Sequence, residues 1–150
     1  MARIRPHERE LVAQQLGPSL ETLFWQMDRC DQRHGLDVYH TLHKAGHRDA
    51  ALLQAALLHD VGKAGGGLTL VHRVTVVLLE KHAPHLLERW TQDGRTWRAP
   101  LVRHVQHAQL GAQWVLEADI SPQAAEWIRR HHTDPTDDRL AALQWADKQN

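Results

Sequence analysis

The sequence predicts an all-α protein, folded as a single helical bundle of about six or seven helices. Apolar residues recur at helical spacing, as in Leu20, Leu23, Phe24 and Met27, which occupy positions i, i+3, i+4 and i+7. Helix-breaking and helix-capping residues separate these stretches. At 150 residues the chain has the size of one domain. We expect residues 1–30 to form helices that pack on a core of residues 31–148.

Two helices are predicted in the N-terminal thirty residues. The first runs from Pro6 to Leu16 and is closed by Gly17-Pro18, because proline cannot continue a helix. The second is predicted to begin after Ser19, which is a good N-cap residue. Its apolar stripe, described above, should face the core of the bundle.

The next two helices are expected to form the centre of the bundle. A bend is predicted around His34-Gly35, after which a helical pattern continues to Gly46, a suitable C-cap. Asp49 is the predicted N-cap of a helix over residues 51–58, which are apolar on almost every side. A helix without a polar face must be buried, so this one should lie in the middle.

The second half of the chain is also predicted to be helical. Residues 68–79 combine strand propensity with a helical apolar face, and we interpret them as a helix. Ser121-Pro122 combines an N-cap with proline at the first helical position. The remaining predicted helices cover residues 86–90, 101 to about 118, 122–132 and 140–147.

Composition excludes several classes of protein. Lys+Arg and Asp+Glu are equal at 18 each, so no overall positive charge favours binding to nucleic acid. No apolar run approaches the ~20 residues that cross a bilayer, and no secretory signal is visible, so we expect a cytoplasmic protein with no membrane partner. A single cysteine, Cys30, can form neither an internal disulfide nor a thiolate zinc site, and we expect it to be a small core residue.

The 13 histidines point to metal chemistry, because neutral imidazole is a common ligand of transition metals. They are dispersed, and one of them begins the run His59-Asp60-Val61-Gly62-Lys63 directly after the most buried predicted helix. Titratable residues at that place need a functional reason. A nitrogen and oxygen ligand set suits Mn, Fe, Co, Ni or Zn, and Mg is a further candidate.

The segment from Ala55 to Lys63 resembles the "ALLHD(I/V)GK" signature of the HD-domain superfamily of metal-dependent phosphohydrolases. Residues 31–38 are similar to that family's first-histidine helix, and Trp145-Ala146-Asp147 is similar to its final element. The resemblance implies an all-α fold and a divalent metal. The ligands that it implies are His34, His59, Asp60 and Asp147.

The first ligand has two candidates. Tyr39-His40-Thr41-Leu42 also imitates the start of the family's first-histidine helix. His34 lies 25 residues before the doublet (59 − 34) and His40 only 19 (59 − 40). The shorter spacing leaves little room for the rest of a helix, a turn and the next helix, so we favour His34.

Two further segments resemble the two-metal members of the superfamily. His107-Ala108-Gln109-Leu110-Gly111 is similar to "H-x-x-(I/L)-G", and residues 128–132 are similar to "I-x-x-H-H". The resemblance implies that His107, His131 and His132 hold a second metal and that Asp60 bridges the two. His104, three residues before His107, is an alternative or supporting residue. The Gly-Tyr-Pro signature of cyclic-di-GMP phosphodiesterases is absent after His132, which disfavours that activity.

The expected function is therefore hydrolysis of a phosphomonoester or phosphodiester bond in a small nucleotide or dinucleotide, with one or two divalent metals as cofactors. Asp60 and Lys63 are the expected catalytic residues, and Lys63 should also contact a phosphate. Weaker candidates for binding the anionic substrate are Arg33, Arg73, Arg103 and Arg130. The alternatives are a non-catalytic ligand-sensing module, a di-iron HD-fold oxygenase and a nucleic-acid-binding helical protein.

Overall fold

A computed structural model describes residues 3–64, 85 and 99–150. These residues form α-helices and one short 3₁₀ helix, with no strand among them, so the predicted all-α class is confirmed. The predicted helices over 68–79 and 86–90, and Arg73, lie outside the described residues. The elements are α1 (Pro6–Gln26), α2 (Arg29–Lys44), α3 (Ala50–Leu58), η1 (Val61–Lys63), α6 (Ala99–Glu117), α7 (Pro122–Arg130) and α8 (Asp138–Lys148).

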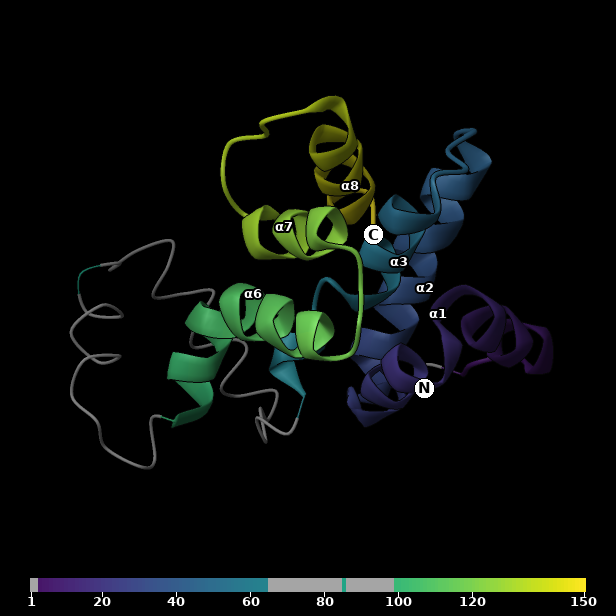
Figure 1. The fold of residues 1–150 in the computed structure, drawn as a ribbon, viewed down its shortest axis with the longest axis horizontal. Helices are drawn as coiled ribbons and strands as arrows, with labels where there is room; N and C mark the ends of the chain where they lie inside the picture. The colour runs from purple at the N-terminus through teal and green to yellow at the C-terminus, as the bar shows by residue number, and fades with distance from the viewer. Residues whose placement is uncertain (1–2, 65–84, 86–98) are drawn as a thin grey trace.

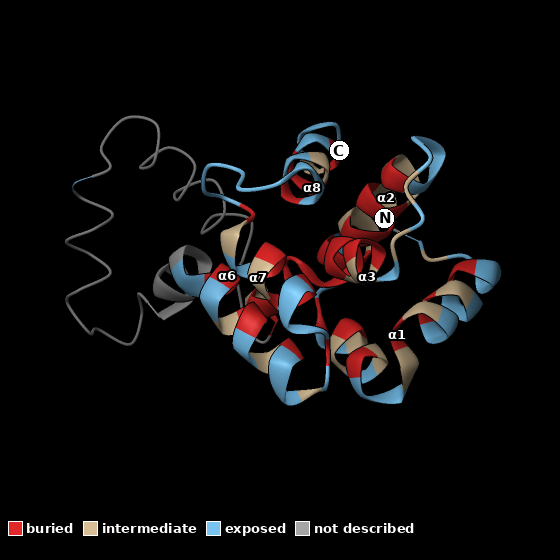
Figure 2. Ribbon diagram, turned by 45° about the horizontal axis from the view of Figure 1, so that its top comes forward, coloured by how far each residue is buried: buried red, intermediate tan, exposed pale blue. Residues whose placement is uncertain are grey.

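Helix α3 lies at the centre of the bundle, as predicted from its apolar sequence. It contacts α1, α2, α7 and α8 (Figure 1). Most of its residues are buried, whereas α1 has an exposed outer face (Figure 2). Because α3 is buried on several sides, the residues directly after it, beginning with His59, lie inside the protein.

Helix α1 is two helical segments joined by a kink. Gly17 has φ 68° and ψ 174°, a left-handed conformation that glycine adopts without a steric penalty, and Pro18 follows it. The predicted break at this dipeptide is therefore present, although the chain resumes the helix at once. The buried face of α1 consists mainly of Val12, Leu16, Leu20 and Phe24.

Helix α2 is continuous, so the predicted bend around His34-Gly35 is wrong. The glycine serves packing instead, since a Cβ at Gly35 would lie 2.7 Å from the carbonyl oxygen of Leu57 in α3. The end of α2 follows the prediction. Gly46 has φ 95°, and the amides of Gly46 and His47 donate to the carbonyls of His43 and Leu42 at 3.2 and 3.1 Å, which is a Schellman motif.

The predicted N-caps of α3 and α7 are confirmed. Asp49 Oδ1 accepts from the amide of Leu52 at 2.9 Å, and Ser121 Oγ accepts from the amide of Ala124 at 3.2 Å. Helix α7 ends at Arg130, so the predicted extension to residue 132 is wrong and the two histidines that follow stand in a turn.

Cys30 is exposed, which corrects its prediction as a core residue. The inward positions at the start of α2 belong to Asp31 and Gln32 instead. Gln32 Nε2 donates to the carbonyl oxygen of Met27 at 2.8 Å, which connects the start of α2 to the end of α1. Among the described residues, no helix has the length and apolar content needed to cross a membrane.

Candidate metal centre

Five helices bring histidine and aspartate side chains to the C-terminal end of α3. His59 and Asp60 follow α3 directly, and the 3₁₀ turn η1 then carries Lys63. The other contributing residues come from α2, α6, the turn after α7, and α8. Two groups have ligand atoms within 4.8 Å of one another: His34, His59 and Asp147, and His107, His131 and His132.

The first group, His34/His59/Asp147, combines two ring nitrogens with one carboxylate. Asp147 Oδ1 lies 2.8 Å from His34 Nε2 and 3.6 Å from His59 Nε2. His59 is buried, while His34 and Asp147 are each partly exposed. The group is therefore closed on the side of α3 and open on the side of α2 and α8.

The ring of His59 is oriented as a metal ligand would be. Its Nδ1–H donates to the carbonyl oxygen of Ala56 at 2.9 Å, which leaves the lone pair on Nε2. That buried Nε2 has no hydrogen-bond partner within the described part of the chain. An orphaned buried acceptor is costly unless something binds it, and a divalent metal fits this donor set.

The second group, His107/His131/His132, consists of nitrogen ligands alone. His107 Nε2 lies 3.3 Å from His131 Nε2 and 3.2 Å from His132 Nε2. Two imidazoles that share an ion at ~2.1 Å would have nitrogens about 3.0–3.4 Å apart. His131 Nδ1–H donates to the carbonyl oxygen of Ile128 at 2.6 Å, so its Nε2 is also left as the ligand atom.

Asp60 lies between the two groups and faces each of them with a different oxygen. Its Oδ2 is 3.7 Å from His59 Nε2. Its Oδ1 is 3.3 Å from His107 Nε2 and 3.9 Å from His131 Nε2. Lys63 Nζ donates to Oδ2 at 2.6 Å. Asp60, the only buried carboxylate at the site among the residues that the structure describes, is thus placed between the two groups.

The electrostatics of the site keep its carboxylates ionised. Burial alone would raise the pKa of Asp60, but His59, His107 and Lys63 outweigh it and hold that pKa well below its usual range. Burial likewise opposes ionisation of Asp147, and contacts with His34 and His59 overcome it, so the pKa of Asp147 is also lowered.

Three histidines of the site, His59 in the first group and His131 and His132 in the second, differ in their affinity for protons. Burial lowers the pKa of His59, but the negative charges of Asp60 and Asp147 outweigh burial and raise that pKa overall. Burial, together with His59 and His132, holds the pKa of His131 well below its ordinary value. Partial desolvation of the ring in its contact with His107, together with the charge of His107, lowers the pKa of His132. His131 and His132 are therefore favoured in the neutral form, which is the form that binds metal.

The seven residues predicted as metal ligands lie together around Asp60. The structure also distinguishes the two candidates for the first ligand, His34 and His40. His34 lies in the first group. His40 instead points Nε2 toward Glu8 Oε1 at 3.3 Å, on another face of α2. Their roles as ligands stay predictions, but the convergence of His34, His59, Asp60, His107, His131, His132 and Asp147 is observed.

The predicted substrate-binding arginines are placed differently. The guanidinium of Arg33 pairs with Glu8 and Asp37 at 2.8 Å each. Arg130 Nε donates to Thr133 Oγ1 at 3.3 Å, beside the second group. The side chains of Arg103 and His104, on α6, are outside the described set. Their parts in substrate binding stay predictions.

Two glycines and a glutamine support the site without having been predicted to do so. A Cβ on Gly62 would overlap the carbonyl oxygen of His107 and lie 2.7 Å from the amide nitrogen of Gly111, so this glycine pair lets α6 approach η1. Gln144 Nε2 donates to the carbonyl oxygen of Thr133, next to His132. One sequence holds no signal for such contacts, because they join segments far apart in the chain.

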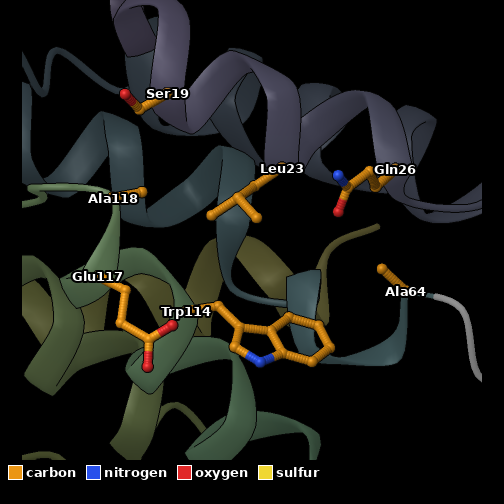
Figure 3. Close-up of a pocket in the computed structure, with 7 residues that line it drawn as sticks. All are labelled: Ser19, Leu23, Gln26, Ala64, Trp114, Glu117 and Ala118. Carbon is orange, nitrogen blue, oxygen red and sulfur yellow. The ribbon is translucent and has the colours of Figure 1, made fainter.

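A cavity of about 650 Å³ between α1 and α6 does not involve either histidine group. Leu23 and Trp114 face each other across it, and Gln26 and Glu117 lie at its margin (Figure 3). None of the predicted ligands lines this space. The concentration of titratable residues lies instead around Asp60.

Comparison of the chain with protein-family models, with curated proteins and with solved structures finds no match.

Proposed function

We propose that this chain is a metal-dependent phosphohydrolase of the HD-domain type, acting on a phosphomonoester or phosphodiester bond in a small nucleotide or dinucleotide. The observation that carries the proposal is the position of Asp60, with one oxygen facing His59 and the other facing His107. A buried carboxylate shared between two ligand groups is suited to a dinuclear centre.

The residues divide into two ligand sets. His34, His59 and Asp147, with Asp60 Oδ2, would hold one divalent transition metal. His107, His131 and His132, with Asp60 Oδ1, would hold the other. When bound, such ions lower the pKa of a water molecule toward neutrality and neutralise charge on phosphoryl oxygens.

The chain's own residues would orient and bind the substrate. His59, Asp60 and His131 form the buried wall of the site, whereas His132 is exposed and His34 and Asp147 are partly so. Among the described residues, these exposed and partly exposed ligands mark the side from which a phosphate would enter. Lys63 lies beside Asp60 with its side chain partly exposed, and its ammonium group would contact an entering phosphoryl oxygen.

Support for a nucleotide comes from the resemblance of Ala55–Lys63 to the HD signature, together with the ordered further elements ending at Asp147. The convergence of seven histidine and aspartate side chains from five parts of the fold, with both carboxylates kept ionised, is hard to explain as structural packing.

The test compares Asp60→Asn with a matched control, Asp119→Asn. Asp119 is exposed and has φ 65°, a conformation that asparagine tolerates, so the control removes one carboxylate of similar size away from the site. We expect close to two equivalents of transition metal in the native protein and in the control, and a large loss of both in Asp60→Asn. Elemental analysis measures this.

The same three proteins are then screened with Mn²⁺ against nucleoside mono-, di- and cyclic phosphates, with and without oxygen. We expect the native protein and the control to release phosphate at similar rates. In Asp60→Asn the rate should fall by about 10²–10³-fold. Nucleotide binding without turnover would favour a sensing module, and an oxygen-dependent product would favour an oxygenase. Either result, or a chain that binds no metal, would overturn the proposed function.

A further inference from the structure

A second polar cluster lies where the N-terminal residues meet the outer face of α2. It surrounds a cavity of about 500 Å³, here called the amino-terminal pocket, lined by Arg3, Arg5, His7, Glu8, Arg33, Asp37 and His40. Among the described residues no apolar side chain lines it, and none of its residues belongs to either histidine group. It is thus a cavity of a different kind from that between Leu23 and Trp114.

The inner wall of the pocket is an ordered network around Glu8, whose side chain is only 4% exposed. Glu8 Oε1 accepts from Arg33 Nη1 at 2.8 Å and lies 3.3 Å from His40 Nε2. Glu8 Oε2 accepts from the backbone amide of Arg5 at 2.8 Å. Both oxygens of the Glu8 carboxylate are therefore engaged by partners within the wall.

Arg33 connects this inner wall to the more exposed residues of the pocket, here called its rim. Besides Glu8, it contacts Asp37 Oδ1 through Nε at 3.0 Å and through Nη2 at 2.8 Å. Its single positive charge is thus shared by two carboxylates. The side chain of Asp37 is 44% exposed, so its charge is partly screened by solvent.

The rim carries the excess positive charge. Arg3 and Arg5 are exposed, and no carboxylate of the described residues forms an ion pair with either. Three arginines against two carboxylates give the pocket a net charge of +1 with His7 and His40 neutral. Guanidinium groups bind phosphate oxygens with paired, charge-assisted hydrogen bonds, and ~300–1,000 Å³ is the usual size of a small-ligand site.

We propose that the amino-terminal pocket binds a small phosphate-bearing anion at a site separate from the metal centre. Arg3 and Arg5 contact the anion, while Glu8 and Arg33 hold the wall in place. Asp37 opposes the anion and limits the affinity. The proposal does not depend on the proposed function, since no residue of the pocket belongs to either histidine group.

The pocket and the metal centre share helix α2 but not its face. Arg33 and His34 are adjacent, and adjacent residues of a helix point roughly 100° apart. An anion in the pocket would connect the residues before α1 to the outer side of α2. We therefore expect the anion to stabilise the folded chain without occupying the metal ligands.

The experiment is calorimetric titration of pyrophosphate into the full chain, after metal has been removed with a chelator and the chelator dialysed away. The test variant is Arg3→Ala/Arg5→Ala. The matched control, Arg29→Ala/Arg139→Ala, removes the same charge from exposed arginines elsewhere. We expect binding by the native chain and the control, and binding weaker by about tenfold or more in the test variant. Asp37→Asn should bind more tightly than the native chain.

Thermal unfolding provides a second readout that also reports whether each variant folds. Pyrophosphate is compared with KCl at equal ionic strength, which removes general salt effects. We expect pyrophosphate to raise the melting temperature of the native chain and the control, and to have little specific effect on Arg3→Ala/Arg5→Ala. Equal responses in all variants, no binding to the native chain, or an equal loss in the control would each overturn the proposal.

Discussion

The two histidine groups share Asp60 but differ in the ligands that surround it. The first group, His34/His59/Asp147, adds a second carboxylate and is partly open to solvent. The second group offers three ring nitrogens: His107 and His131 are buried, and the pKa values of His131 and His132 are lowered. Among the described residues, the only negative charge beside it is that of Asp60. A site with an added carboxylate suits hard ions such as Mn²⁺ better than an all-nitrogen site does, so the two positions are not equivalent.

The largest expected effect on stability comes from a substitution that would push α6, which carries His107, away from η1. Gly62→Ala would place a Cβ against the carbonyl oxygen of His107 and the amide of Gly111, both backbone atoms that cannot rotate away. We expect a loss of about 1–3 kcal/mol in the free energy of unfolding, from overpacking. Denaturant unfolding measures it, and metal analysis should show the second group emptied more than the first.

Gly46→Ala is not a suitable control, because Gly46 has positive φ. Ala45→Gly, at an exposed helix end, is one that leaves the site untouched. If Gly62→Ala kept the stability and metal content of the native chain, the close approach of α6 and η1 would have no part in the site.

Substitution of one predicted ligand in each group should distinguish the metal preference of the first group from that of the second. We expect His34→Ala and His131→Ala each to lose about one equivalent of metal, because each removes one ligand from one group only. Binding of Mn²⁺ should suffer more in His34→Ala, and binding of Zn²⁺ more in His131→Ala. Titration of the metal-free variants with each ion tests this. Identical losses for both ions would show that the groups act as one.

As the pH falls, metal should leave the two histidine groups in a defined order. The raised pKa of His59 means that protons compete for that ligand at a higher pH than they do for an ordinary histidine. The lowered pKa values of His131 and His132 mean that these ligands stay neutral to a lower pH. As pH falls, the first group should therefore release its metal before the second. Metal retained after equilibration at stepped pH measures the order, and the reverse order would contradict it.

The smallest expected effect concerns His40. Its ring faces Glu8 and not the metal centre, so His40→Ala should retain both equivalents of metal. Loss of this partly buried contact should cost about 1 kcal/mol of stability. Elemental analysis beside His34→Ala provides the comparison. Loss of metal in His40→Ala would restore His40 as the first ligand.

Much of the fold was predictable from local sequence. The apolar run of residues 51–58 required a buried helix, and Asp49, Ser121 and Gly46 each mark a helix end that the structure contains. The errors arose where tertiary contact overrides local preference. Gly35 looked like a helix breaker but allows α2 to approach Leu57, and Cys30 looked like a core residue but lies on the outer side of α2.

The sequence by itself determined the all-α class and which residue types are available at the end of α3, because helix periodicity and capping are local properties of the chain. Only the tertiary structure decided which of them meet. The choice of His34 over His40, the position of Asp60 between two groups, and the engagement of Arg33 with Glu8 each depend on how helices distant in sequence pack together. Such contacts join residues separated by up to 113 positions, beyond the reach of any local pattern.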